Sequence, residues 1–273
     1  SNMDGFGYVE ELPPEAAGPV SGVMIFHGNT SPDDAAVDGR GQWVELRPGH
    51  GTGYSTDGAT VSYSDRFGVE LTFARTLKER DPDASIAIIK YSRGGSSIDR
   101  TAAGKWGCWD PDYPDAKGTG INQYDHFLAT IRNAMSVDDI DGDGEPDTLV
   151  PMGIVWMQGE ADASSSVEIA ERYEENLERL MDLFRAALRT DDLPVVIGRI
   201  SDSYQYGEKK DSKVWNHGQI VREEQESFVA NDPRAALVTT TDNYGYSDPW
   251  HYDSAGYLDL GKQFAIAVHS LQE

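Results

Sequence analysis

The sequence predicts an α/β protein, a three-layer sandwich in which helices cover both faces of a doubly wound, mainly parallel five-stranded sheet. Short apolar runs alternate along the chain with longer segments of helical periodicity, the order typical of strand–helix–strand units. The apolar runs are continuous and do not alternate with polar residues, which indicates strands buried on both faces. A length of 273 residues suits one large α/β domain.

Five runs predict the strands. The first reads Val-Met-Ile-Phe and the second Ile-Ala-Ile-Ile, and both are rich in residues that favour buried strands. In order, the predicted strands lie at 23–26, 86–89, 152–156, 193–198 and 236–238.

Apolar residues recur at helical spacing between these strands. Leu71, Ala74 and Leu77 share one side of the first predicted helix, and the longest stripe has seven apolar positions between Ile169 and Leu188. The predicted helices lie at 70–80, 124–135, 169–188, 214–229 and 255–271.

One domain accounts for nearly the whole chain. Residues 1–20 are polar and contain Pro and Gly, so we expect an N-terminal tail there and a single domain over 21–273, which shows no internal repeat or composition break. Ser1-Asn2 is typical of what remains after a cloning tag is removed, and a signal peptide removed at the same point would make the protein secreted or periplasmic.

Composition excludes several classes of function. The net charge of −24 repels phosphate backbones, so we expect no nucleic-acid partner. No stretch approaches the roughly 20 apolar residues that span a bilayer. The one cysteine, Cys108, cannot form an internal disulfide or a thiolate metal cluster.

Reactive side chains follow four of the predicted strands. In a doubly wound sheet, functional groups gather just beyond the carboxyl ends of the strands. These segments are His27-Gly28-Asn29-Thr30-Ser31, Gly94-Gly95-Ser96-Ser97, Gln158-Gly159-Glu160 and Asp248-Pro249-Trp250-His251. Each has an ordinary structural explanation, such as a helix cap, a tight turn or a solvated glutamate. Together they supply a hydroxyl, a histidine base with an aspartate partner, and N–H donors for an oxyanion, which are the parts of an acyl-transfer site.

Three of these motifs carry a resemblance to a known family. The segment 88–97 resembles a strand that ends in a Gly-Gly-(Ser/Thr)-Ser turn, 156–162 resembles Trp-x-Gln-Gly-Glu-x-Asp, and 248–251 resembles Asp-x-x-His. Over roughly residues 21 to 270, the chain is similar to the SGNH hydrolase superfamily. Within it, the chain resembles the carbohydrate acetylesterases that include sialate O-acetylesterase and acetylxylan esterase relatives.

The resemblance implies a flavodoxin-like SGNH hydrolase fold and a role for each matching residue. His251 would be the general base and Asp248 its partner. The main-chain N–H of Gly95 and the side-chain amide of Gln158 would form the oxyanion hole. As further contacts of the substrate or of these residues, it implies Arg93 and Glu160.

The nucleophile position departs from the family pattern. Where the family has Gly-Gln-Ser-Asn, this chain has Gly28-Asn29-Thr30-Ser31. Register favours Thr30, whereas chemistry favours Ser31, because the β-branch of threonine restricts χ1 and crowds the attack. A third alternative is that neither residue attacks and the chain has lost hydrolysis.

The segment 139–147 matches the first nine positions of an Asp-x-Asp-x-Asp-Gly calcium loop. We expect its acidic residues to bind a structural Ca²⁺, although Val150 stands where such a loop normally ends in Glu. The alternative is a solvated acidic loop. The candidate ligands are Asp139, Asp141, Asp143, Glu145 and Asp147. Catalysis by a hydroxyl and a histidine requires no cofactor.

The predicted function is hydrolysis of O-acetyl esters from a sugar or polysaccharide by a serine-type or threonine-type esterase. The alternative is a catalytically impaired carbohydrate-binding protein on the same scaffold. It is motivated by the altered nucleophile segment and by loop aromatics that suit stacking on sugar rings. These aromatics are Trp106, Trp109, Tyr113 and Trp250.

Overall fold

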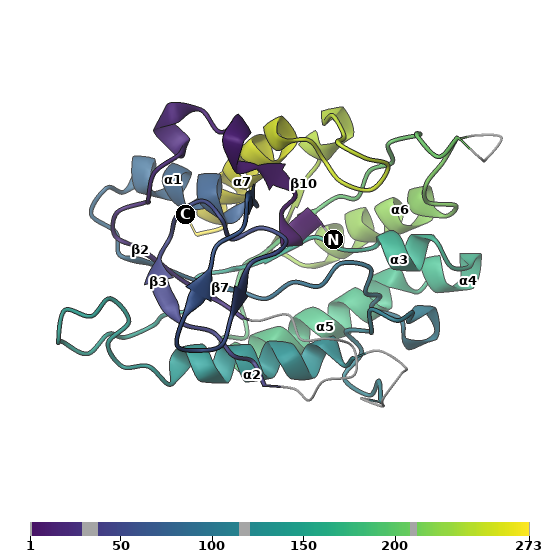
Figure 1. Cartoon of the computed structure of the whole chain (residues 1–273). Coiled ribbons are helices and arrows are strands. Elements are labelled where there is room, and N and C mark those ends of the chain that lie inside the picture. The colour runs from purple at the N-terminus through teal and green to yellow at the C-terminus, as the bar shows by residue number, and fades with distance from the viewer. Residues whose placement is uncertain (1, 29–37, 115–120, 208–211, 273) are drawn as a thin grey trace.

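A computed structural model describes residues 2–28, 38–114, 121–207 and 212–272 (Figure 1). The strands are β1 (Gly7–Tyr8), β2 (Val23–His27), β3 (Trp43–Glu45), β4 (Ser55–Thr56), β5 (Val61–Ser62), β6 (Arg66–Phe67), β7 (Ile86–Lys90), β8 (Ile154–Trp156), β9 (Val195–Gly198) and β10 (Ala235–Val238). The α-helices are α1 (Glu70–Arg80), α2 (Gln123–Met135), α3 (Glu160–Ala163), α4 (Val167–Ala170), α5 (Tyr173–Leu188), α6 (Gly218–Asn231) and α7 (Ser254–Ser270).

The five predicted strands are present as β2, β7, β8, β9 and β10, in a mixed α/β arrangement. They are divided between two three-stranded sheets: β2 pairs with β7 in parallel and with β3 in antiparallel fashion, and β8, β9 and β10 form a second, parallel sheet. Among the described residues no strand ladder joins β7 to β8, so a single five-stranded sheet is not confirmed. A cavity of about 1200 Å³ lies there, and aromatic side chains such as Tyr91, Trp109 and Phe184 line it.

Helices lie on both faces of these sheets. In Figure 1, α1 and α7 lie together on one side, and α2 and α5 lie on the other. Side chains of β9 alternate between the faces: Val196 belongs to the core against α1 and α7, whereas Val195 and Ile197 belong to the core against α5 and α6. This alternation follows from the two-residue period of a strand and explains why the strand reads as apolar throughout.

Three of the described α-helices, α2, α4 and α7, begin where a polar side chain accepts a backbone N–H of the first turn. Asn122 caps α2 and Asp253 caps α7 in this way. The segment 169–188, expected as one helix, is divided between α4 and α5, and the helix expected at 214–229 is α6.

Residues 2–20 pack against the rest of the domain, with Asn2, Ala16 and Val20 buried. β1 pairs with β6, and the N–H of Tyr8 donates to the hydroxyl of Ser254 at the start of α7. Among the described residues, no helix is both long and apolar enough to cross a membrane.

Candidate active site

His251 and Asp248 form a hydrogen-bonded pair on the loop before α7. The imidazole Nδ1 lies 2.7 Å from Oδ2 and 3.0 Å from Oδ1 of Asp248. The same carboxylate accepts the backbone N–H groups of Trp250 and His251, at 2.8 and 2.9 Å, so a tight turn fixes both side chains. Within the described ranges, nothing forms a hydrogen bond with the other ring nitrogen, Nε2.

The charge on Asp248 fixes the tautomer of the histidine. Burial alone would raise the pKa of Asp248, but hydrogen bonds from the His251 side chain and from the N–H of Trp250 outweigh it and lower the pKa. An ionised carboxylate accepts a hydrogen bond from Nδ1–H, which keeps the proton on Nδ1 and leaves the lone pair on Nε2. The pair therefore has the arrangement of a general base and the group that orients it.

Gly95 lies in the turn that follows β7, where only glycine fits. Its φ is +73°, and a Cβ added there would lie 2.2 Å from Cδ1 of Trp106. Gly95 is exposed, and in the described part of the chain its N–H has no hydrogen-bond partner. This N–H is therefore available to an incoming oxyanion.

Gln158 joins the carboxyl ends of β7 and β8. Its buried amide nitrogen donates to the carbonyl of Ser96 at 3.0 Å and to Oδ2 of Asp162 at 2.6 Å. The hydroxyl of Tyr173 donates to the backbone carbonyl of Gln158 at 2.6 Å. Both amide hydrogens of Gln158 are thus in use, and they hold the Gly95–Ser96 turn against the residues after β8.

Asp162 completes this junction, although sequence reasoning assigned it no role. It also accepts the N–H groups of Ile98 and Asp99, at 3.1 and 2.9 Å. Complete burial raises its pKa to about 6, although its hydrogen bonds, that of Gln158 foremost, act in the opposite direction. The available signal was the last position of the Trp-x-Gln-Gly-Glu-x-Asp motif.

Arg93 follows β7 and Glu160 follows β8, the two strands whose ends meet at Gln158. The guanidinium carbon of Arg93 lies 4.9 Å from the ring centroid of Trp106, beside the Gly95 turn. Glu160 begins α3, and its carboxylate accepts the Asn2 amide at 3.5 Å. Asn2 also accepts the N–H of Tyr252, so Glu160 lies near the residue that follows His251.

The two candidate nucleophiles, Thr30 and Ser31, lie outside the described residues. The last described residue before them is Gly28, whose N–H donates to the carbonyl of Lys90 at 2.8 Å. Gly28, which follows β2, therefore lies beside the carboxyl end of β7, the end that leads into the Gly95 turn.

Phe6 contacts the site and was not predicted, because nothing in a polar N-terminal segment indicates it. Its ring stacks on the imidazole of His251, with centroids 3.5 Å apart and planes inclined by 18°.

A second pair of histidines lies beneath the end of β2. Nδ1 of His27 is 3.4 Å from Nδ1 of His50, and both rings stack on Tyr54. Burial first, and then the charge of Lys90, lower the pKa of His27 well below its ordinary value and that of His50 to about 3. Both rings are therefore neutral at physiological pH.

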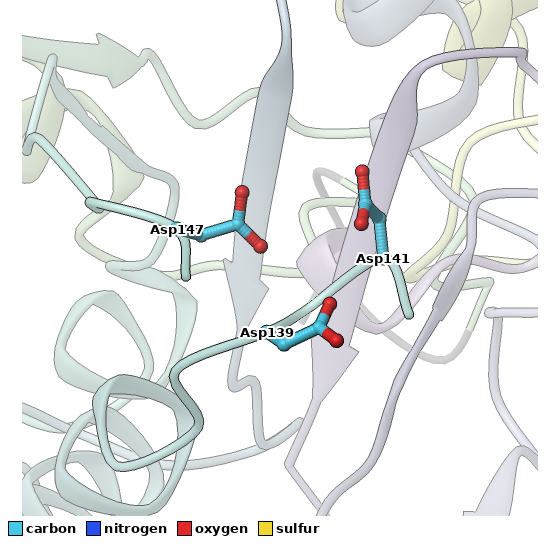
Figure 2. Close-up of side chains that lie close together, drawn as sticks. All are labelled: Asp139, Asp141 and Asp147. Atoms are coloured by element: carbon cyan, nitrogen blue, oxygen red, sulfur yellow. The ribbon is translucent and has the colours of Figure 1, made fainter. Parts of the chain in front are cut away.

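The acidic loop after α2 gathers three of the five predicted calcium ligands. Oxygen atoms of Asp139, Asp141 and Asp147 lie within 4.8 Å of one another (Figure 2). Asp143 and Glu145 are not part of this group. Three carboxylates at this spacing suit a hard divalent cation, so these residues fit the predicted ion.

The loop aromatics differ in their exposure. Trp106 and Trp250 are 39% and 45% exposed, whereas Trp109 is 4% exposed and packs in the core against Trp156 and Phe184. Trp109 is therefore not available to stack on a sugar ring.

Comparisons with known proteins place the chain in a family. The model of a family described as carbohydrate esterase, sialic acid-specific acetylesterase, matches residues 1–270. A solved structure of a protein from Arabidopsis thaliana shares 19% identity and a TM-score of 0.66, over 98% of this chain and 94% of that one. A carbohydrate acetylesterase from Xanthomonas citri shares 19% identity and a TM-score of 0.63, over 99% of this chain and 54% of that one.

The comparison with curated proteins found no match. At 19% identity, the two solved structures show a shared fold and nothing finer. The family match covers nearly all of the 273 residues and does not depend on either structure. The chain therefore belongs to the carbohydrate esterase family of sialic acid-specific acetylesterases.

Proposed function

We propose that this protein is a serine-type or threonine-type esterase that removes O-acetyl groups from a sugar or polysaccharide. The observation that carries the proposal is the His251–Asp248 pair, in which Nε2 of His251 has no hydrogen-bond partner among the described residues. A neutral imidazole oriented in this way takes a proton from a hydroxyl. Membership of a carbohydrate esterase family supports an acetylated carbohydrate as the substrate.

The reaction has two steps. A hydroxyl of Thr30 or Ser31 gives its proton to Nε2 of His251 and attacks the acetyl carbonyl. Asp248 stabilises the imidazolium that forms. When the tetrahedral intermediate collapses, His251 returns the proton to the departing sugar oxygen, and the acetyl group remains on the protein. In the second step, water gives a proton to His251 and attacks the acetyl carbonyl, and acetate is released as the proton returns to the hydroxyl of the nucleophile.

The oxyanion is stabilised by two N–H donors. The N–H of Gly95 has no hydrogen bond to a described residue that it would have to break. The amide of Gln158 is the second donor, and its hydrogen leaves the Ser96 carbonyl when the oxyanion forms. Arg93, which lies over the Trp106 ring, and Glu160, which accepts the Asn2 amide, are expected to contact the substrate or the oxyanion donors.

The strand pairing supports a finer assignment of the fold. Parallel pairing of β2 with β7 and of β8 with β9 and β10, with helices on both faces, supports a doubly wound sandwich of the flavodoxin-like SGNH type.

Acetate release tests the proposal. We expect the protein to release acetate from p-nitrophenyl acetate and from O-acetylated sialic acid or xylan, and we expect His251→Ala to abolish release. Thr30→Val and Ser31→Ala then identify the nucleophile, because one of them removes activity and the other retains it. Binding of the acetylated sugar without release by the unmodified protein would favour the carbohydrate-binding alternative instead.

A further inference from the structure

The N-terminal segment places one aromatic side chain on His251. Phe6 and His251 lie at opposite ends of the sequence, yet their rings stack face to face at 3.5 Å. Aromatic rings prefer offset or edge-on contacts unless a specific arrangement holds them parallel. The parallel stack of Phe6 on His251 therefore needs another constraint, and the backbone on either side of Phe6 supplies it.

Two glycines fix the path of that backbone. A Cβ on Gly5 would lie 2.5 Å from Cα of Gly68, and a Cβ on Gly7 would lie 2.5 Å from Cζ of Phe67. The segment before and after Phe6 thus lies against β6 and the residue after it, at a distance that only glycine allows. Phe6 is the one side chain projected between these two close approaches.

Hydrogen bonds hold this segment to the domain. The carbonyl of Phe6 accepts the guanidinium of Arg66 at 2.8 Å, and the carbonyl of Gly5 accepts the N–H of Thr52 at 2.8 Å. The ammonium of Lys90, at the end of β7, lies 3.4 Å from the carbonyl of Asp4. The ring of Phe6 is therefore held by the same framework that carries the active-site loops.

Asp248 and Phe6 constrain different parts of the imidazole. Asp248 holds the Nδ1 edge, which fixes the tautomer but allows the ring to tilt about that hydrogen bond. Phe6 covers one face of the ring and removes that tilt. An aromatic face also attracts a cation, so the ring of Phe6 favours the imidazolium that exists only after proton transfer.

We propose that Phe6 is a positioning residue for His251: its ring fixes the plane of the imidazole whose Nδ1 is held by Asp248, and it stabilises the imidazolium that forms during attack. The inference rests on the proposed esterase function. It predicts that the N-terminal segment contributes to turnover and not only to stability.

Kinetics of three variants test the role. In Phe6→Leu we expect kcat for p-nitrophenyl acetate to fall about 10- to 100-fold, the scale of a small misplacement of a catalytic group, with KM unchanged. Phe6→Tyr keeps the ring and is expected to restore kcat. Tyr8→Leu is the matched control, since Tyr8 lies two residues away and stacks on Arg66 instead. If kcat falls as much in Tyr8→Leu as in Phe6→Leu, the loss comes from a less ordered N-terminal segment. The positioning role of Phe6 would then be wrong.

A spectroscopic measurement separates this inference from the proposed function. A proton on an imidazole stacked beneath a benzene ring is shifted upfield in the NMR spectrum, and His251→Asn identifies the signals by their disappearance. We expect upfield His251 signals in the unmodified protein and a return toward ordinary positions in Phe6→Leu. Ordinary positions in the unmodified protein overturn the stack, whether or not the variant folds.

The two failures have different signatures. If the unmodified protein releases no acetate but its His251 signals are shifted, the proposed esterase function fails and the contact stands. If it releases acetate and Phe6→Leu keeps full kcat, the esterase function stands and the positioning role of Phe6 is overturned.

Discussion

At the scale of single residues, the proposed oxyanion site depends on the side-chain amide of Gln158, which already has two hydrogen-bond acceptors. Gln158 holds the Ser96 carbonyl and Asp162 with its two amide hydrogens. An oxyanion stabilised by this amide competes with the Ser96 carbonyl for one hydrogen, and a negatively charged acceptor wins that competition because charge-assisted hydrogen bonds are stronger.

Gln158→Ala is expected to lower kcat about 10²- to 10³-fold with little change in KM, because removal of one oxyanion donor costs that much. Steady-state kinetics on a small acetyl ester measures it. Tyr173→Phe is the comparison variant: it removes a hydroxyl that bonds to the backbone carbonyl and to Oε1 of Gln158 but leaves the amide hydrogens in place, so its kcat should fall far less than that of Gln158→Ala. A fully active Gln158→Ala would exclude the oxyanion role.

Gly95→Ala is expected to remove activity and to destabilise the fold by about 1–3 kcal/mol, the usual cost of forcing a side chain into a sparsely populated conformation. Two causes combine: a φ of +73° and a Cβ that would meet Trp106 at 2.2 Å. Urea unfolding and acetate release measure both effects. Gly18→Ala is the control, because a Cβ there meets nothing within 4 Å. An active, equally stable Gly95→Ala would show that the turn is not constrained as described.

At the scale of elements, the sequence predicted what periodicity encodes. β2, β7, β8, β9 and β10 appear where apolar runs predicted them. Burial on both faces explains the unbroken apolar run in β9 and nearly all of β2, whereas Ala87 in β7 is exposed. The interruption between α4 and α5 was not predicted. At this break, the hydroxyl of Tyr173 donates to the backbone carbonyl of Gln158, and the spacing of apolar residues carries no information about such a tertiary hydrogen bond. Two-residue strands such as β1 and β6 leave no pattern, so the docking of the N-terminal segment on the site was also missed.

The acidic loop gives a prediction at this scale. Ca²⁺ at 100 times its Kd is expected to stabilise the fold by about 2.7 kcal/mol and a chelator to reverse this, because an ion that binds only the folded state shifts the equilibrium by mass action. Differential scanning calorimetry checks it, and esterase activity should stay unchanged, since the loop precedes β8 at the end opposite Gln158.

Variants assign the effect to the three gathered carboxylates. Asp139→Asn with Asp141→Asn should abolish the response to Ca²⁺, whereas Asp138→Asn, an exposed neighbour outside the group, should preserve it. A melting temperature that ignores both Ca²⁺ and chelator in the unmodified protein would leave a solvated acidic loop as the correct interpretation.

At the scale of the whole molecule, acidic and buried groups set the dependence of stability on pH. His27 and His50 are buried and neutral, with pKa values lowered by burial and by Lys90. In the unfolded chain each has an ordinary pKa of about 6.5 and binds a proton below it. The unfolded state therefore gains protons first as pH falls, and the stability present above about pH 6.5 is lost toward the pKa of about 3 of His50. Asp162 acts in the opposite direction, because its raised pKa of about 6 lets the folded state hold a proton that the unfolded chain has lost.

On acidification, His27 and His50 lower the free energy of unfolding and Asp162 raises it, so the two histidines together determine the sign of the change. The free energy of unfolding is expected to fall on acidification from pH 6.5 to pH 5, with each histidine contributing about 1.4 kcal/mol per pH unit at full slope. Urea unfolding at pH 7, 6 and 5 measures this slope. His50→Gln removes one titrating group and should flatten the curve. Identical slopes for His50→Gln and the unmodified protein would mean that His50 takes up no proton on unfolding between pH 7 and pH 5, and this account of the acid sensitivity would be wrong.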